Sequence, residues 1–453
     1  MSVALHTERE RVLSLVHRHG WNATAFQTLE SGYCYSFHGD DACVAYVDTG
    51  AAWVVAGAPI AEHAAIARVA AEFVARARAA GRRCCFFATE ERLQAAAGGA
   101  LRSLCIGEQP VWDPREWPVI LAGHRSLREQ LRRARAKGVR TREVSPTELE
   151  ASPTQEAIKR LIRRWLATRG MAGMGFLVRV EPFEFPSHRR CFVAELDERV
   201  VGFAGVVPIP ARSGWFIEDL LRDPHAPNGS GELLVDAVMS WAARGGCDWL
   251  TLGLAPLAGD VAPPLRFARK STAFLYDFQG LRSFKAKLRP QSWSPIYISH
   301  PPSQGALISI ADALIAFTRG GLLRFGLRSF LRGPNALIRA LAFLLVPWTL
   351  LLMIAPSQRY FMSAWIKWAW VGFDALLALA LFHWLQKPTK GLLTALAVAV
   401  TADAALTSLQ ALLWNVRQVQ GTWDVLLIAV GCAAPLIAAT VLWGARFSRF
   451  RAL

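Results

Sequence analysis

The stretch 214–254, GWFIEDLLRDPHAPNGSGELLVDAVMSWAARGGCDWLTLGL, contains the pattern that decides the fold of the N-terminal part of the chain. Its first segment, GWFIEDLLR, is rich in apolar side chains and is typical of a strand. The segment GELLVDAVMSWAARGG has apolar residues at helical spacing and ends on two glycines, which predicts a helix. CDWLTLGL then predicts a second, buried strand. We therefore expect a strand–helix–strand unit here.

The same order of elements occurs earlier, between residues 20 and 110. The strand-like segments CVAYVDTG and AAWVVAGAP meet at a turn, and the helix-like EHAAIARVAAEFVARARAAG ends at Gly81 before the buried strand RCCFFAT. Ahead of the second unit, RRCFVAELDERVVGFAGVVP predicts a hairpin that turns near Asp197 and Glu198. Two mixed units in tandem predict an α/β (α+β) chain with an internal duplication.

The C-terminal quarter contains four apolar stretches, at roughly 338–356, 361–385, 391–414 and 424–444. Each is close to the ~20 residues that a helix needs to cross the hydrocarbon core of a bilayer. Tryptophans mostly lie near the ends of these stretches, as in the aromatic belts of membrane proteins. The sequence therefore predicts four transmembrane helices over residues 335–453.

Basic residues concentrate in the loops on one side of these stretches. Five arginines, from Arg319 to Arg339, precede the first stretch, two lysines separate the second from the third, and three arginines follow the fourth. The opposite loops contain Arg359 and Arg417. The positive-inside rule then places both termini in the cytoplasm, and the charged N-terminus lacks the apolar core of a signal peptide. We expect a multi-pass protein of the inner (plasma) membrane with its N-terminal domain in the cytoplasm.

Three further features bear on compartment and membrane contact. The eight cysteines include no C-x-x-C pair and no metal-ligand spacing, and are typical of buried thiols in a reducing cytosol. Asp374 and Asp403 lie inside predicted spans, where a carboxylate is either functional or hydrogen-bonded within the bundle. The segment 303–333 has apolar residues at helical spacing with arginines between them, and is either an interfacial amphipathic helix or a packed linker helix.

The chain has 453 residues and a formal net charge of +16 at pH 7. Most of that excess lies ahead of the apolar stretches, where 42 basic residues face 32 acidic ones. A basic soluble part favours a polyanionic partner, either nucleic acid or anionic lipid headgroups. Simple solubility is the alternative interpretation.

Several long motifs resemble one family. The stretch 214–259 and the segment YDFQGLRSFKAKLRP at 276–290 are similar to the catalytic domain of the phosphatidylglycerol lysyltransferases. IGEQPVWDP at 106–114 and LREQLRRARAKGV at 127–139 fit the same family, so the resemblance spans roughly residues 15–300. It implies two GNAT-like (acetyltransferase-type) folds. The family includes the multiple peptide resistance factors, in which a flippase-like membrane region precedes the catalytic domain, whereas here the bundle follows it.

These observations predict tandem GNAT-like acyltransferase folds followed by a C-terminal four-helix transmembrane bundle. An N-terminal GNAT-like half covers residues 1–120, and a C-terminal, catalytic GNAT-like half covers 121–300. An amphipathic basic linker at 301–334 then leads to the four transmembrane helices at 335–453.

The resemblance implies that Asp219 and Arg222 belong to the active site, because the family has an Asp and an Arg at this spacing. Asp219 would hold the substrate's amino group or accept a proton, and Arg222 would bind a phosphate through paired N–H donors. A structural ion pair at a strand end is the alternative. Lys285 and Lys287, on a segment interpreted as extended, would point to one face and neutralise an oxyanion or a lipid phosphate, unless they form a solvated basic run. Asp260 is a candidate second acid, or else a loop carboxylate.

The turn before the helix of the second unit is glycine-rich. Asn228, Gly229, Ser230 and Gly231 present backbone N–H groups that suit a phosphate or carboxylate. A helix cap with no ligand is the alternative. Acetyl-CoA enzymes of this fold have Arg or Gln where this chain has Ala226, which weakens the case for CoA binding.

Eight cations fall within residues 125–142, on a predicted helix. RNA phosphates or anionic lipid suit them, although a plain surface helix has the same appearance. Arg128, Arg132 and Arg135 are our candidates for contacts to the RNA backbone, and Arg282 for assisting the lysines. Because no RNA-reading module with paired aromatics is present, we expect only the backbone and 3′ end of a tRNA to be recognised.

The implied reaction is transfer of an amino acid, lysine or a similar one, from aminoacyl-tRNA to the hydroxyl of phosphatidylglycerol or a related lipid. One ester is exchanged for another, so the reaction needs positioning, a proton acceptor and oxyanion stabilisation, but no cofactor or metal. Two alternatives stay open: an acyl-CoA-dependent N-acyltransferase on the same fold, and a catalytically inactive membrane protein.

Overall fold

The computed structural model consists of two compact units, one mostly within residues 1–325 and the other mostly from residue 326 onward. Residues 319–335, which include the second part of the predicted basic linker, lie outside the described residues. The structure describes residues 2–150, 152–168, 175–262, 265–266, 278–318, 336–356, 361–386 and 388–449.

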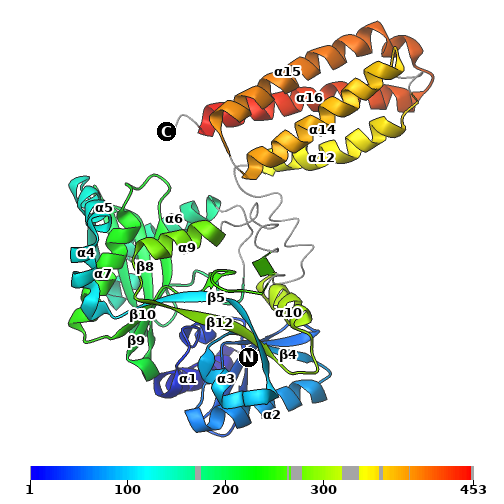
Figure 1. Cartoon of the computed structure of the whole chain (residues 1–453). Coiled ribbons are helices and arrows are strands. Elements are labelled where there is room, and N and C mark those ends of the chain that lie inside the picture. Colours follow the sequence, from blue (N-terminus) through cyan, green and yellow to red (C-terminus); the bar gives the residue numbers. More distant parts are fainter. Residues whose placement is uncertain are drawn as a thin grey trace. The chain divides into compact units, whose positions relative to one another are not determined.

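The first unit is built around one mixed β-sheet (Figure 1). Its described strands are β1 (Cys34–Phe37), β2 (Cys43–Asp48), β3 (Ala52–Ala56), β4 (Arg83–Thr89), β5 (Arg102–Trp112), β6 (Arg140–Val144), β7 (Arg190–Leu196), β8 (Arg199–Ile209), β9 (Gly214–Arg222), β10 (Trp249–Thr251), β11 (Ala255–Pro256) and β12 (Ser292–His300). The strand order is β1-β2-β3-β4-β12-β5-β10-β9-β8-β7-β6, and β11 pairs with β5.

Helices cover the sheet or extend it at its ends. They are α1 (Ser2–His19), α2 (Ile66–Ala79), α3 (Glu91–Ala97), α4 (Trp117–Gly123), α5 (Arg125–Ala136), α6 (Pro153–Ala167), α7 (Ser230–Arg244), α9 (Phe278–Lys287) and α10 (Ala306–Thr318).

The predicted duplication is present in the sheet. The pairs β3–β4 and β9–β10 are parallel, and α2 and α7 provide the crossover helices that parallel strands require. The predicted hairpin is also confirmed, because β7 and β8 are antiparallel and turn at Asp197 and Glu198, which both have a positive φ. The α/β class and the tandem GNAT-like organisation are thus confirmed.

The two halves share one sheet because β12 crosses between them. It lies between β4 and β5, although the whole second unit of the duplication separates it from them in sequence. β5 then pairs with β10 on its other side. Both halves belong to one compact unit. The domain boundary that we expect near residue 120 therefore remains a prediction based on the sequence repeat.

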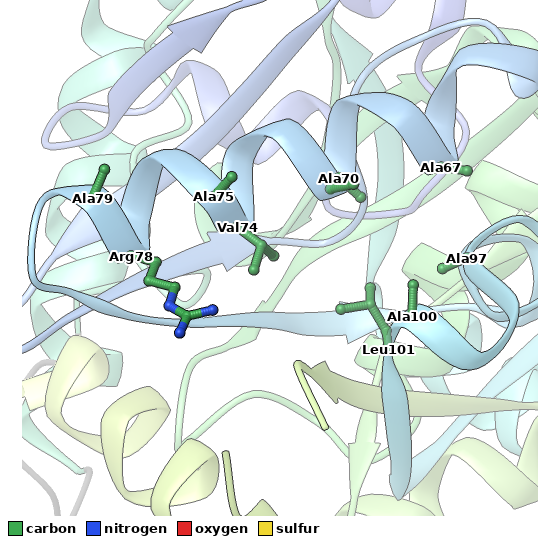
Figure 2. Close-up of a pocket in the computed structure, with 10 residues that line it drawn as sticks. Ala67, Ala70, Val74, Ala75, Arg78, Ala79, Ala97, Ala100 and Leu101 are labelled. Atoms are coloured by element: carbon green, nitrogen blue, oxygen red, sulfur yellow. The ribbon is translucent and has the colours of Figure 1, made fainter. Parts of the chain in front are cut away.

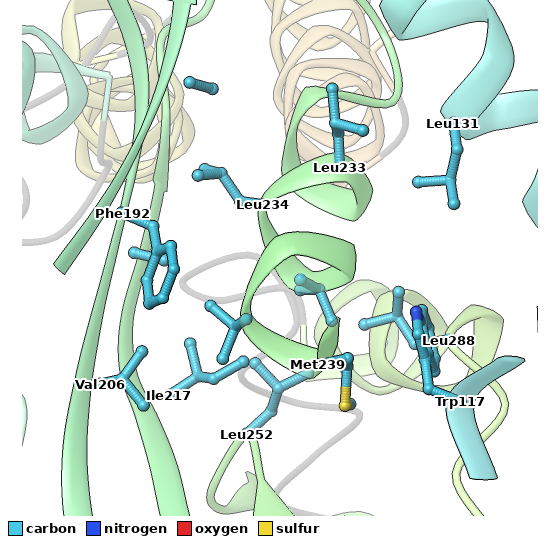
Figure 3. Close-up of a cluster of buried hydrophobic side chains, with 14 of the residues drawn as sticks. Trp117, Leu131, Phe192, Val206, Ile217, Leu233, Leu234, Met239, Leu252 and Leu288 are labelled. Carbon is cyan, nitrogen blue, oxygen red and sulfur yellow. The ribbon is translucent and has the colours of Figure 1, made fainter. Parts of the chain in front are cut away.

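The main core of the second half forms where α7 packs on the sheet. Figure 3 shows Leu234 and Met239 of α7 beside Phe192, Val206 and Ile217 of the strands, all of them buried. Removing a side chain of this size from water contributes about 1.5–3 kcal/mol. This packing fixes α7, and the turn before it, against β9.

Two predictions about local structure are wrong. The helix predicted over 125–142 ends at Ala136, because Gly138 adopts a φ of 85° and the chain enters β6 at Arg140. Lys285 and Lys287 lie on the helix α9, whereas we expected an extended segment. Residues two apart on a helix do not share a face, so one lysine is buried and the other is exposed.

The second unit contains the helices α12 (Ala336–Ile354), α14 (Ala364–Gln386), α15 (Lys390–Leu413) and α16 (Thr422–Arg449). Each includes a segment long and apolar enough to cross a membrane, which confirms the four predicted apolar helices and identifies an integral membrane protein. Asp374 and Asp403 are buried among these helices, and Thr407 donates a hydrogen bond to Asp403 over 3.1 Å. That bond supports the interpretation of Asp403 as a hydrogen-bonded group within the bundle.

A buried ion pair connects the two halves of the first unit. Glu90 follows β4, and its carboxylate lies 2.7 Å from Arg212, which precedes β9. The Arg212 guanidinium lies between the rings of Trp21 and Trp249, 4.3 and 4.4 Å from their centroids. Stacking between two rings and pairing with one carboxylate hold this guanidinium away from water.

Glu90→Leu is expected to destabilise the protein, because it leaves the Arg212 charge buried without its partner. Loss of one member of a buried pair costs about 3 kcal/mol or more. Thermal unfolding of the full chain in detergent checks this, with the exposed neighbour Glu91→Leu as the matched control. Equal melting temperatures for the two variants would contradict the role assigned to the pair.

Candidate active site

Asp219 is a buried carboxyl group in the middle of the sheet. It lies on β9 opposite Gly205 of β8, and the residue is 5% exposed. A Cβ at Gly205 would lie 3.3 Å from the Asp219 Oδ2 atom, so the glycine leaves room for the carboxyl group. This Oδ2 has no hydrogen-bond partner among the described residues.

Asp219 lies within electrostatic range of two other carboxyl groups, those of Glu218 and Glu30, and of the Arg189 guanidinium. Glu218 is its neighbour on β9 and is 3.1 Å from Arg189, with both side chains almost fully buried. Glu30 and Glu181 lie in two loops, one in each half. The charges of Glu181, Glu218, Asp219 and Arg189 all affect the pKa of Glu30. We call Glu30, Glu181, Glu218, Asp219 and Arg189 the acidic cluster.

Glu218 pairs with Arg189 and Glu181 pairs with Arg179 over 2.8 Å, whereas among the described residues no cation forms an ion pair with Glu30 or Asp219. Burial, followed by the charges of Glu218, Glu181 and Asp219, raises the pKa of Glu30 to about 9. Burial, followed by the charge of Glu218, raises the pKa of Asp219 well above its ordinary value. Both shifts favour the protonated form of the carboxyl group, and a cation that enters beside them opposes the shift.

One carboxyl oxygen of each acid in the acidic cluster is buried without a hydrogen-bond partner among the described residues. Buried polar atoms are nearly always paired, so four unpaired acceptors in one place favour a ligand with N–H donors. Across the described ranges, no set of His, Cys, Asp or Glu side chains is arranged to hold a metal ion. The chemistry of the acidic cluster suits an ammonium group.

Arg222 lies at the exposed end of β9, three residues beyond Asp219. Its Nη1 donates to the Asn228 side chain over 3.2 Å, so the arginine contacts the predicted phosphate-binding turn. Gly229 has a φ of 94°, and a Cβ there would lie 2.6 Å from the Gln130 carbonyl oxygen. The close approach of α5 thus explains this glycine, while Gly231 has open space up to Phe284, 3.9 Å away.

Lys285 is buried in α9 and uses its ammonium group within the protein. Its Nζ donates to the carbonyl oxygens of Leu252, Gly253 and Leu254 over 2.8, 2.8 and 2.9 Å. Those three bonds match the three N–H donors of an ammonium. Burial lowers the pKa of Lys285 to about 7. The lysine therefore holds the segment that follows β10, where Gly253 has a φ of 68° against the Phe216 ring.

The remaining predicted residues near α9 are exposed. Lys287 faces away from the core. Arg282 pairs with Glu108 of β5 over 2.7 Å, and its guanidinium lies 4.9 Å from the Trp293 ring centroid. Asp260 is fully exposed and lies 3.9 Å from Arg266. The structure does not bring these side chains into contact with Asp219, so their catalytic roles remain predictions.

The three arginines predicted to bind RNA all have partners within the first unit. Arg128 donates to the carbonyl oxygens of Leu121 and Ala122. Arg132 pairs with Glu129, and Arg135 pairs with Asp236 of α7 over 2.6 Å. Among the residues that the structure describes, Arg125, Lys137 and Arg140 make no ion pair. These three are the better candidates on this surface for contacts to an external polyanion.

A groove of about 480 Å³ lies along α2, and no residue of the acidic cluster lines it. Figure 2 shows that alanines line it, with Arg78 as its charged side chain. No predicted site residue lines this groove.

The model of the family described as phosphatidylglycerol lysyltransferase, C-terminal, matches residues 13–300. The chain belongs to this family. The matched range contains every residue of the acidic cluster, Lys285 and the glycine-rich turn.

Two curated relatives carry names from this family's chemistry. The phosphatidylglycerol lysyltransferase of Bacillus subtilis is 28% identical over 166 residues, which cover 34% of this chain and 19% of the relative. The lysylphosphatidylglycerol biosynthesis bifunctional protein LysX of Nocardia farcinica is 26% identical over 254 residues, which cover 53% of this chain and 22% of the relative. The chain thus matches about a fifth of the length of each.

Two solved structures share the fold. The C-terminal domain of a lysylphosphatidylglycerol synthetase from Agrobacterium fabrum is 23% identical, with a TM-score of 0.60 over 70% of this chain and 99% of that one. The structure of L-PGS from Bacillus licheniformis is 20% identical, with a TM-score of 0.59 over 71% of this chain and 97% of that one. At these identities the likeness establishes the fold alone.

Sequence reasoning in this phosphatidylglycerol lysyltransferase family member found Asp219 but missed its neighbours. Glu218 had a visible signal, since two acids in succession interrupt an otherwise apolar strand. Glu30, Glu181 and Arg189 had none, because each lies in a polar loop where charged residues are ordinary. Only the folded chain brings them together.

Gly229→Ala is expected to destabilise the protein by about 1–3 kcal/mol, because it places a methyl group against the Gln130 carbonyl and requires a left-handed backbone. Gly231→Ala is the matched control for folding, since its methyl group meets no close atom. Urea or thermal unfolding of both full-length variants in detergent measures the difference. If the two alanines cost the same, close packing of α5 is not what requires Gly229.

Glu30 makes stability depend on pH. In an unfolded chain the group ionises near its ordinary pKa of 4.5, whereas in the folded protein it keeps its proton up to about pH 9. The folded state binds the extra proton within that window, so stability is greatest at low pH and falls as the pH rises. We expect the melting temperature of Glu30→Gln to fall less than that of the wild type between pH 6 and pH 8.5. Parallel curves would contradict a protonated Glu30.

Proposed function

We propose that this chain is a membrane-anchored aminoacyltransferase that moves an amino acid from aminoacyl-tRNA to the hydroxyl of phosphatidylglycerol or a related lipid. Membership of the family and the names of the curated relatives support transfer to phosphatidylglycerol. The single observation in the structure that supports an aminoacyl donor is the acidic cluster, with its four unpaired carboxyl oxygens. An acyl group without an amine has no N–H donor for those oxygens.

The acidic cluster is suited to the α-ammonium or side-chain ammonium of the aminoacyl group. A cation that enters favours the ionised forms of Glu30 and Asp219, and each ionised group gains a charge-assisted hydrogen bond. A buried carboxylate with a raised pKa is also a suitable proton acceptor for a lipid hydroxyl. Asp219 is our candidate for that role.

The reaction exchanges one ester for another. The lipid hydroxyl oxygen bonds to the aminoacyl carbonyl carbon, the bond from that carbon to the ribose oxygen breaks, and the proton passes through Asp219 to the leaving ribose oxygen. Arg222, exposed beside the turn at Asn228, is placed to bind a phosphate of either substrate. Lys285 acts as a positioning residue, because it fixes the carbonyl groups that follow β10.

We propose that the first unit and both termini face the cytoplasm. The basic loops predicted between the spans support this orientation, and aminoacyl-tRNA is available on that side. The exposed cations Arg125, Lys137 and Arg140 would then contact the tRNA backbone in place of the paired arginines of α5.

Lipid mass spectrometry after expression of the full chain tests the proposal. Membranes that contain the chain are incubated with phosphatidylglycerol and a charged tRNA mixture, and an aminoacylated lipid that disappears with RNase is the expected product. A product that requires acyl-CoA and resists RNase would instead establish the N-acyltransferase alternative. No new lipid under either condition would favour the inactive protein.

Asp219→Asn is expected to lower the rate of lipid aminoacylation by about 100-fold or more, the usual effect of losing a proton acceptor. Its melting temperature should not fall, because the amide removes a buried acid from the acidic cluster. Normal product formation by this variant would refute the role of Asp219.

Lys285→Met and Lys287→Met form a matched pair on one helix. We expect the first to lower the rate at least about tenfold, because it leaves three carbonyl groups of the site without a donor, each costing about 1–3 kcal/mol. The second removes an exposed charge and should change the rate less than twofold. Equal rates for the two variants would contradict a positioning role for Lys285.

A further inference from the structure

The outer face of α10 is an apolar surface on the first unit. Among the described residues ahead of the second unit, six large apolar side chains are exposed, and three of them, Leu307, Ile308 and Leu314, belong to α10. Leu307 is 68% exposed, Ile308 49% and Leu314 50%. With the exposed Ala311, they follow the i, i+4, i+7 spacing of one helix face.

The inner face of α10 is fixed to the sheet. Its one charged residue, Asp312, is 1% exposed and forms two hydrogen bonds with Arg83 of β4, at 2.8 and 2.6 Å. The Phe317 ring packs on two other rings, and its centroid lies 5.1 Å from that of Phe87 and 5.3 Å from that of Phe176. The helix is therefore held at two points along its length, and its outer face keeps a fixed direction relative to the sheet (Figure 1).

The exposed face carries no charge at all, since Asp312 points inward. This contrasts with α5 of the same unit, whose exposed residues include Arg132 and Arg133. A contiguous apolar stripe on a water-facing helix marks a surface that another apolar phase covers.

The position of α10 in the chain indicates which phase covers it. Seventeen residues separate Thr318 from Ala336, where the first membrane-spanning helix begins. Such a segment spans at most about 60 Å when extended, which limits how far α10 can move from the bilayer. Four arginines and no acidic residue lie in that segment, which favours anionic headgroups beside α10.

We propose that the outer face of α10, formed by Leu307, Ile308, Ala311 and Leu314, docks into the interfacial layer of an anionic bilayer. The inner face fastens the same helix to β4, so docking fixes the orientation of the whole first unit over the membrane surface. In this proposal α10 is a packed linker on its inner face and an interfacial helix on its outer face, while residues 319–333 of the predicted segment lie outside the described residues. This surface is independent of the reaction that the acidic cluster performs.

Site-specific photo-cross-linking in the full chain tests the docking surface. p-Benzoylphenylalanine replaces Leu307 or Leu314 in protein reconstituted into nanodiscs of phosphatidylglycerol and phosphatidylcholine. Val119 of α4, which is 65% exposed, is the control position with similar exposure. We expect lipid adducts at 307 and 314 at least about tenfold above those at 119, as burial of one such side chain implies.

The same products distinguish the other occupants. Cross-links to peptides from residues 336–449 would show that the helical bundle covers α10, and cross-linked dimers would show that a second copy does. Either result, or lipid adducts no higher than at Val119, overturns the proposal.

A second variant tests the apolar contact without a probe at the changed position. Leu314→Glu, combined with the probe at 307, should lower the lipid adduct several-fold, because it places a charge at the bilayer interface. Val119→Glu with the same probe should leave the adduct unchanged. An unchanged adduct in Leu314→Glu would also overturn the proposal. Because Leu314 points outward, we expect the variant to keep the wild-type melting temperature, and that measurement is the control for its fold.

Discussion

The pairing of β5 with β12 on one side and with β10 on the other is the interaction on which the first unit depends. It joins two strand–helix–strand units into one sheet, and it does so with a strand from the end of the soluble sequence. Because β12 follows the second unit in sequence but pairs with β4 and β5, neither half can complete its sheet alone. The buried ion pair of Glu90 and Arg212 also connects the two halves. The site near β9 therefore exists only when both halves have folded.

Closing that junction buries carboxyl groups that a smaller fold would leave in water. Glu30 comes from the first half, Glu218 and Asp219 from the second, and Arg189 compensates only part of their charge. Burial raises the pKa of Glu30 and Asp219, which is the usual response of a buried carboxyl group. Each acid also keeps one buried oxygen without a hydrogen-bond partner among the described residues, which suits the uptake of a cation and is the physical basis of the proposed aminoacyl specificity.

The attachment of α10 links the chemistry of the first unit to the membrane. A lipid substrate does not leave the bilayer readily, so an enzyme that acts on its headgroup gains from a fixed orientation at the surface. Asp312 and Arg83 provide rigidity on one side of the helix, and the leucines on the other side provide the affinity for an apolar phase.

The sequence by itself determined the duplicated α/β pattern and the four apolar helices, and it proposed Asp219 as a site residue. These follow from hydrophobic periodicity over 10–25 residues and from one long motif, and both are local properties. Only the tertiary structure decided the partners of Asp219, the insertion of β12 and the burial of Lys285. The lysines were misjudged because FKAKLRP was interpreted as extended, and a change from strand to helix sends residues two apart to different faces. The sequence does not show that Arg128, Arg132 and Arg135 already have partners within the first unit, and their contacts to RNA stay a prediction. Long-range contacts depend on how separate segments pack, and no local pattern records that packing.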